Sequence, residues 1–138
     1  MNSDQSIRIV IAEDSRIQAK MLIKRLESAG YEVRWGANGS EALDLIRDDP
    51  PDLIISDIEM PEMNGYQLCQ TVKQDRTLKR IPLILLSTLS SPEDIIEGLQ
   101  AGADNYVTKP YEADYLLGRV DSLLHSTCLL YTSPSPRD

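Results

Sequence analysis

The sequence contains no phenylalanine, one tryptophan, one histidine and two cysteines among its 138 residues. Without phenylalanine, the core has to be filled mainly by aliphatic side chains. The two cysteines, Cys69 and Cys128, are too few for a disulfide framework. We therefore expect reduced thiols and a cytoplasmic protein.

Long apolar runs are also missing, since none approaches the roughly 20 residues that a membrane-spanning helix needs. The N-terminal segment is polar and shows no signal peptide, so we expect no membrane partner. Basic residues are the minority: 14 Lys and Arg stand against 22 Asp and Glu, a formal net charge of −8. This balance argues against direct nucleic acid binding and favours a partner with a basic face.

Strand and helix patterns alternate along the chain. Short apolar runs cover residues 7–11, 31–35, 53–56, 83–86 and 105–108, and the segments between them carry apolar residues at helical spacing. This alternation predicts one α/β domain with a parallel sheet covered on both faces. Gly30 and Gly102 are expected to end the first and fourth helices. Ile95, Ile96 and Leu99 are expected to form the inner face of the fourth.

Polar residues follow four of these runs. They are Glu13 and Asp14 after the first run, Asp57 after the third, Ser87 and Thr88 after the fourth, and Lys109 after the fifth. Open α/β sheets bind ligands at the carboxyl ends of their strands. Carboxylates, an ammonium group and a hydroxyl gathered there predict a site for a divalent cation and a phosphoryl group.

The chemistry of these groups is mutually consistent. A carboxylate can accept a phosphoryl group to give an aspartyl phosphate. Neighbouring acids can hold Mg²⁺, which prefers oxygen ligands, while a lysine and a hydroxyl offset charge on the phosphoryl oxygens. Simpler explanations stay open: Asp57 as a solvated strand-end acid, Glu13 and Asp14 as charges at a helix N-terminus, and Ser87 as a cap.

Four motifs carry a resemblance to a known family. They are Ile-Ala-Glu13-Asp14-Ser, Ile-Ser-Asp57-Ile-Glu-Met60-Pro61, Leu-Leu-Ser87-Thr and Ala-Gly-Ala-Asp-Asn-Tyr106-Val-Thr-Lys109-Pro110. Through them, residues 7–125 resemble the receiver domain of two-component response regulators. The resemblance implies a flavodoxin-like, doubly wound five-stranded parallel sheet of order 2-1-3-4-5. Residues 1–6 would then be a disordered N-terminus and residues 126–138 a non-native or disordered tail.

The resemblance also implies a role for each site residue. Asp57 would be the phosphoacceptor, and Glu13, Asp14, Asp57 and the backbone carbonyl of Glu59 would bind Mg²⁺. Lys109 would pair with the phosphoryl group and precede a cis Pro110, with Ser87 as the switch hydroxyl and Tyr106 as the switch aromatic. The donor would be a phosphohistidine of a sensor histidine kinase or phosphotransfer protein. The domain would be no enzyme beyond its own phosphorylation and dephosphorylation.

Some alternatives remain at this point. Thr88 competes with Ser87 for the switch role, and Tyr106 can be a plain core aromatic. An aspartyl-phosphate phosphatase of the haloacid dehalogenase type needs a second Asp two residues after its nucleophile, and Glu59 stands there instead. A phosphorylation-independent interaction module would need no Mg²⁺ ligands.

The last residues depart from the pattern. Residues 128–138 show no helical period and contain two Ser-Pro steps. One back-translation of them matches an adapter used in transposon-based sequencing libraries, so we expect them to be foreign to the natural protein. That protein would continue as a longer regulator or hybrid kinase. It could also dimerise through the face formed by the fourth helix, fifth strand and last helix.

Overall fold

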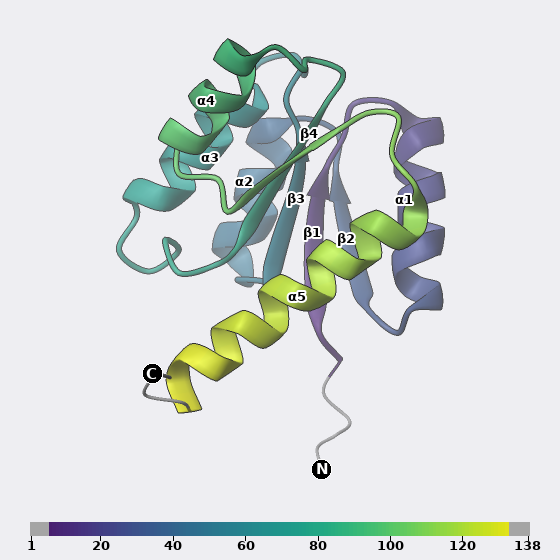
Figure 1. Cartoon of the computed structure of the whole chain (residues 1–138), viewed down its shortest axis with the longest axis vertical. Helices are drawn as coiled ribbons and strands as arrows, with labels where there is room; N and C mark the ends of the chain where they lie inside the picture. The colour runs from purple at the N-terminus through teal and green to yellow at the C-terminus, as the bar shows by residue number, and fades with distance from the viewer. Residues whose placement is uncertain (1–5, 133–138) are drawn as a thin grey trace.

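The computed structural model describes the backbone of residues 6–132 and the side chains of residues 6–125 (Figure 1). Within these residues five strands alternate with five helices. The strands are β1 (Arg8–Ala12), β2 (Glu32–Gly36), β3 (Leu53–Asp57), β4 (Leu83–Ser87) and β5 (Asn105–Thr108). The helices are α1 (Arg16–Ser28), α2 (Gly39–Asp48), α3 (Gly65–Gln74), α4 (Pro92–Gln100) and α5 (Ala113–Thr132).

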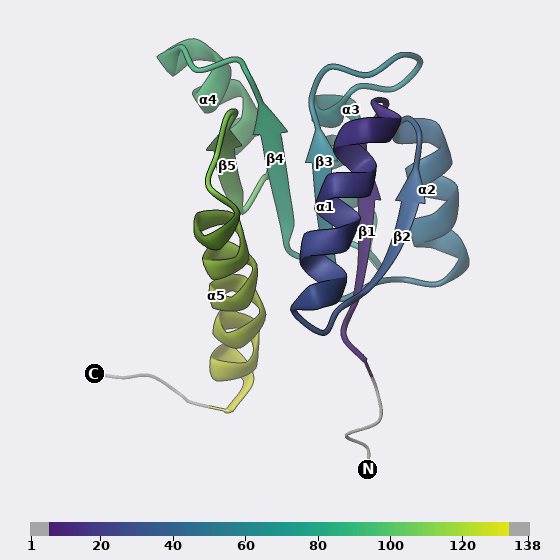
Figure 2. The ribbon, with the colours of Figure 1, turned by 90° about the vertical axis from the view of Figure 1, so that its right-hand side faces the viewer.

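The strands form one parallel sheet of order β2-β1-β3-β4-β5, which confirms the predicted topology. In Figure 1, α5 crosses in front of the sheet and α2 and α3 lie behind it; Figure 2 shows α1 and α5 from the side. The sheet therefore needs an apolar layer on each face.

Two aliphatic clusters fill these layers because alternate side chains of a strand point to opposite faces. Val10 and Ile54 pack with α2 and α3, whereas Ile9 and Ile55 pack with α1 and α5. Strands β3 and β4 are buried at every position. This burial accounts for their continuous apolar runs.

Helix ends follow the local sequence. Ser15 caps α1 by accepting the N–H of Gln18 at 3.3 Å. Asn64 and Gln67 form a capping box at the start of α3. Gly30, with a positive φ angle, follows the end of α1, as predicted.

Two features of the helices differ from the predictions. The inner-face prediction for α4 is wrong for Ile96 and Leu99, which are 52% and 51% exposed; Gly98 is the buried residue of this helix. Helix α5 extends to Thr132, past the predicted boundary at residue 125. No proline or further glycine interrupts the chain between Gly118 and Pro134, so nothing local ends the helix earlier.

The predictions for the chain ends concern other residues. Residues 1–5 and 133–138 lie outside the described residues, and so do the side chains of residues 126–132. Among the described residues, no helix is both long and apolar enough to cross a membrane.

Candidate functional site

The sheet order brings the predicted site residues to one edge. Asp57 and Ser87 are the last residues of β3 and β4, Glu13 follows β1 directly, and Lys109 follows β5 directly. Since β1, β3, β4 and β5 are successive neighbours in the sheet, their carboxyl ends meet. The structure thus gathers groups that lie up to 96 positions apart in the chain.

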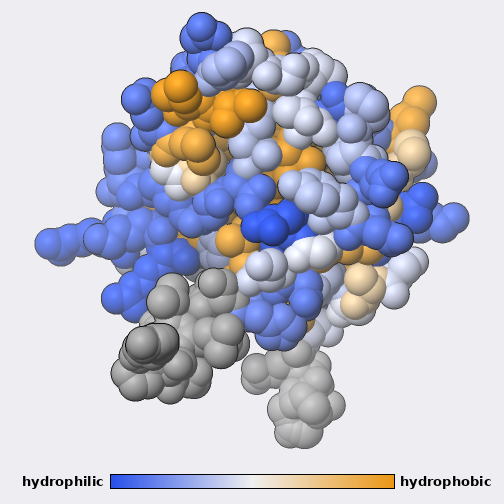
Figure 3. Space-filling view, in the orientation of Figure 1, coloured by the Kyte–Doolittle hydropathy of each residue, from blue (hydrophilic) through white to orange (hydrophobic). Residues whose placement is uncertain are grey.

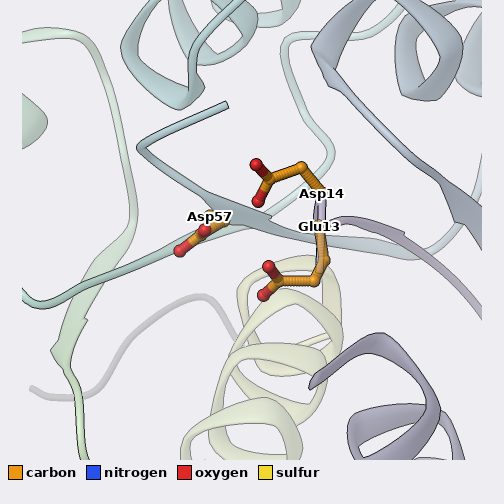
Figure 4. Close-up of side chains that lie close together, drawn as sticks. All are labelled: Glu13, Asp14 and Asp57. Atoms are coloured by element: carbon orange, nitrogen blue, oxygen red, sulfur yellow. The ribbon is translucent and has the colours of Figure 1, made fainter. Parts of the chain in front are cut away.

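Three carboxylates converge at this edge (Figure 4). Glu13, Asp14 and Asp57 each offer an oxygen, and these oxygens all lie within 4.8 Å of one another. Glu13 and Asp57 are only 4% and 8% exposed, whereas Asp14 is exposed. Burial and the neighbouring charge of Asp57 raise the pKa of Glu13. For Asp57, burial is the largest effect and raises the pKa against the opposing pull of Lys109.

This carboxylate cluster fits Mg²⁺ by its chemistry. All three groups are hard oxygen donors, and Mg²⁺ is commonly bound through one or two carboxylates and water. Two of the groups, Glu13 and Asp57, are buried, and the charges of neighbouring acids add to the effect of burial in raising their pKa values. A divalent cation would remove that electrostatic cost.

Lys109 directs its ammonium group at three acceptors. Its Nζ lies 2.9 Å from Asp57 Oδ1, 3.3 Å from Glu13 Oε1 and 2.7 Å from Gln18 Oε1. An ammonium group has three N–H donors, so all three are engaged. Burial lowers the pKa of Lys109, but the bonds and charges of Asp57 and Glu13 outweigh burial and raise it. The bond to Pro110 is cis, as predicted.

The role of Gln18 was missed by sequence reasoning. This residue lies on α1, three positions after the cap Ser15, and belongs to none of the four motifs. Only its contact with Lys109, which is 91 positions away in the chain, identifies it.

Gly65 shapes the backbone beneath Asp57. Its N–H donates to the Ile58 carbonyl at 2.9 Å. A Cβ on Gly65 would lie 2.3 Å from the Asp57 carbonyl oxygen and 2.8 Å from Ile58 Cα. The start of α3 can therefore pack against the end of β3 only where no side chain is present.

The two candidate switch hydroxyls occupy different surroundings. Ser87 is 1% exposed, and its Oγ accepts the N–H of Leu89 at 2.9 Å. The Ser87 side chain also interacts with the Tyr106 hydroxyl, and this hydrogen bond opposes the effect of burial on the pKa of Tyr106. Thr88 is exposed and donates to Glu59 Oε1 at 3.4 Å. Of the two hydroxyls, Ser87 is therefore the buried one and Thr88 the exposed one.

Tyr106 is half-buried on β5 between the site and α4. Its hydroxyl donates to the Leu89 carbonyl at 2.7 Å, and its ring lies against Gly98. Nearby, the Tyr66 hydroxyl donates to the Asp94 carbonyl at 3.1 Å. Burial raises the pKa of Tyr106, and burial with the adjacent Tyr106 hydroxyl raises that of Tyr66. Tyr106 is both a packed aromatic and a hydrogen-bond partner of the loop after β4.

Comparison with known sequences places these features in a family. Residues 9–121 match the response regulator receiver domain. The chain is 38% identical over 120 residues to the probable transcriptional regulator ycf27 of Guillardia theta, covering 87% of this chain and 46% of that protein. It is 36% identical over 118 residues to the response regulator PleD of Caulobacter vibrioides, covering 86% and 26%. The chain thus spans about half or less of the length of these relatives.

Solved structures share the fold. The signal receiver domain of a signal transduction histidine kinase from Syntrophus aciditrophicus is 40% identical, with a TM-score of 0.84 and coverage of 96% of this chain and 97% of that one. The chemotaxis protein CheY4 of Vibrio cholerae is 33% identical, with a TM-score of 0.82 and coverage of 86% and 99%.

Proposed function

This chain belongs to the response regulator receiver domain family of two-component signalling, and from that premise we propose that Asp57 accepts a phosphoryl group from a phosphohistidine. The donor would be a sensor histidine kinase or a phosphotransfer protein. One observation carries the proposal. Asp57 is a buried strand-end carboxylate, 2.9 Å from the ammonium of Lys109 and within 4.8 Å of two further acids.

In the proposed transfer, an oxygen of Asp57 forms the new O–P bond while the P–N bond to the imidazole breaks. The imidazole leaves with the bonding electron pair. Glu13, Asp14 and Asp57, with the backbone carbonyl of Glu59, would hold Mg²⁺, which when bound supplies positive charge against the phosphoryl oxygens. Lys109, already held beside Asp57, supplies a second positive charge without having to be reoriented from solvent.

The switch in this proposal starts at Ser87. Its hydroxyl could donate to a phosphoryl oxygen in place of its interaction with Tyr106, which would draw Ser87 inward. Leu89 is bonded to Ser87 through its N–H and to Tyr106 through its carbonyl. A shift of Ser87 therefore changes the loop that holds Tyr106, and the α4–β5–α5 face shifts between two packings.

That face also suits contact with another protein, which we include in the proposal. Figure 3 shows apolar surface over α4, where Ile96 and Leu99 are exposed, and Tyr115 on α5 is 54% exposed. A dimer through α4–β5–α5, an output or kinase module beyond this sequence and a cytoplasmic location belong to the same proposal. The partial coverage of the relatives supports the further module.

The test is phosphorylation by acetyl phosphate, read by mass spectrometry of the intact protein. We expect one phosphoryl group on the wild type in the presence of Mg²⁺, and none with a chelator or in Asp57→Asn. The matched control is Asp44→Asn, which removes an exposed carboxylate on α2 and should label like the wild type. Equal labelling of Asp57→Asn and the wild type would overturn the assignment.

A further inference from the structure

Trp35, the sole tryptophan of the chain, donates a hydrogen bond into the candidate metal site. It lies one residue before the end of β2 and packs, half-buried, against the cluster under α1 and α5. Its Nε1–H donates to the backbone carbonyl of Glu13 at 2.7 Å. That carbonyl belongs to the peptide group that joins Glu13 to Asp14.

The strand ladder does not supply this bond. Strands β1 and β2 pair in register as far as Ala12 and Gly36. Strand β2 ends at Gly36, and Ala37 and Asn38 then lead into α2, with the Ala37 N–H donating to the Glu41 side chain. The indole therefore supplies the hydrogen bond to the Glu13 carbonyl at the point where the pairing of β1 with β2 ends.

Two further hydrogen bonds hold Glu13 in place. Its N–H donates to the Gly36 carbonyl at 3.1 Å, and its Oε2 accepts the Ser15 N–H at 3.1 Å. The end of β2 thus holds the backbone of Glu13 from both sides, through the carbonyl of Gly36 and the indole of Trp35. Asp14 is exposed, so its direction depends on the peptide that precedes it more than on packing around its side chain.

We propose that Trp35 is a positioning residue for the two metal-binding acids. A peptide group is planar, so fixing its carbonyl fixes the directions of the Cα atoms on both sides. One indole N–H then fixes the Cα positions from which the side chains of Glu13 and Asp14 extend. Without it, the Glu13 carbonyl, in a residue only 4% exposed, would lose its partner and the peptide would rotate toward another donor. The inference rests on the proposed magnesium site.

Because the chain has a single tryptophan, the N–H can be removed by supplying an analogue during expression. β-(3-Benzothienyl)alanine keeps the bicyclic shape and replaces the N–H by sulfur, whereas 7-azatryptophan keeps the N–H and serves as the matched control. Trp35→Phe is the genetic counterpart. Thermal melts establish that each variant is folded before any binding is measured.

Mg²⁺ affinity is measured by calorimetry on the whole chain without a phosphodonor. We expect the benzothienyl variant to bind Mg²⁺ roughly tenfold more weakly, the low end for loss of a group that orients metal ligands. The azatryptophan protein should bind like the wild type. With acetyl phosphate, the half-maximal Mg²⁺ concentration should rise by the same factor, and the rate at saturating Mg²⁺ should return to the wild-type value.

The outcomes separate the inference from the function on which it rests. If the benzothienyl and wild-type proteins bind Mg²⁺ equally, Trp35 does not position the acids. The same conclusion follows if only Trp35→Phe weakens binding, since the ring shape alone would then matter. If the wild type itself neither binds Mg²⁺ nor is labelled by acetyl phosphate, the proposed function fails first, before any substitution is made.

Discussion

Replacing Gly98 by alanine should move the ring of Tyr106 while leaving the fold intact. An alanine Cβ at this position would lie 2.7 Å from Tyr106 Cδ2 and 3.0 Å from Cε2, closer than carbon atoms tolerate. Leu85, 3.1 Å away, is fully buried in β4 and has little room to move. Tyr106 is half-buried and can turn toward solvent. The clash is therefore relieved mainly by rotation of the tyrosine.

Two opposing effects set the change in stability. Alanine in a helix interior is favoured over glycine by about 1 kcal/mol. Rotation breaks the 2.7 Å bond between the Tyr106 hydroxyl and the Leu89 carbonyl, which costs about 0.5–1.5 kcal/mol. The free energy of unfolding should thus change by less than about 1 kcal/mol. For a domain of this size the melting temperature should then shift by less than about 5 °C.

The assay combines a thermal melt with amide hydrogen exchange of residues 88–95, the segment that Tyr106 and Tyr66 anchor. Exchange there should accelerate in Gly98→Ala. The matched control is Gly118→Ala on α5, where a Cβ meets no atom within 4 Å. It should gain helix propensity alone and leave exchange of the segment unchanged. A melting temperature lowered by more than about 10 °C, or unchanged exchange, would refute the reasoning that the ring can move.

Three further predictions concern the site and the chain end. Gln18→Leu should speed phosphorylation by acetyl phosphate about threefold, because Lys109 no longer has to break its hydrogen bond to Gln18 before it pairs with the phosphoryl group. Gln18→Glu should slow the reaction. Rates that change in the same direction in both variants would contradict this prediction. In metal-free protein, burial raises the pKa of Glu13 and Asp57, so the stability they contribute is complete below about pH 4 and is lost as the pH rises through their folded pKa values. Melts across pH should show a smaller fall in Asp57→Asn, and an identical fall would count against the buried pair. A chain cut after Thr127 should keep its melting temperature, because Leu116 and Val120, the buried residues of α5 among those whose side chains are described, precede the cut. A large drop would show that the removed residues pack on the domain.

Much of the fold follows from the sequence because the signals are local. The strands are continuous aliphatic runs, and Ser15 and Asn64 cap helices through atoms only three residues away. The carboxyl ends of parallel strands lie along one edge. Residues at these ends or directly after them, such as Asp57 and Lys109, could therefore be assigned to one site before any distance was known.

The remaining features depend on contacts between distant segments. Helical spacing does not say which stripe of α4 faces the sheet, and there the contact is made by Gly98, which no hydrophobic pattern marks. Gln18 and Trp35 reach the site through a side-chain amide and an indole from α1 and β2. Such bonds carry no sequence signature, because any polar group at the same position in space would serve.

The distribution of the site along the chain has a consequence for biosynthesis. The carboxylates of Glu13 and Asp57 are supplied by the first and third strands, whereas the ammonium of Lys109 follows the last strand, 96 positions after Glu13. A nascent chain therefore exposes its acids to the solvent well before the counter-charge has been translated. Under the proposed function, Asp57 can be phosphorylated only after synthesis has passed β5 and the sheet has formed. Phosphorylation of Asp57 would then be confined to chains whose receiver domain has been translated past Lys109.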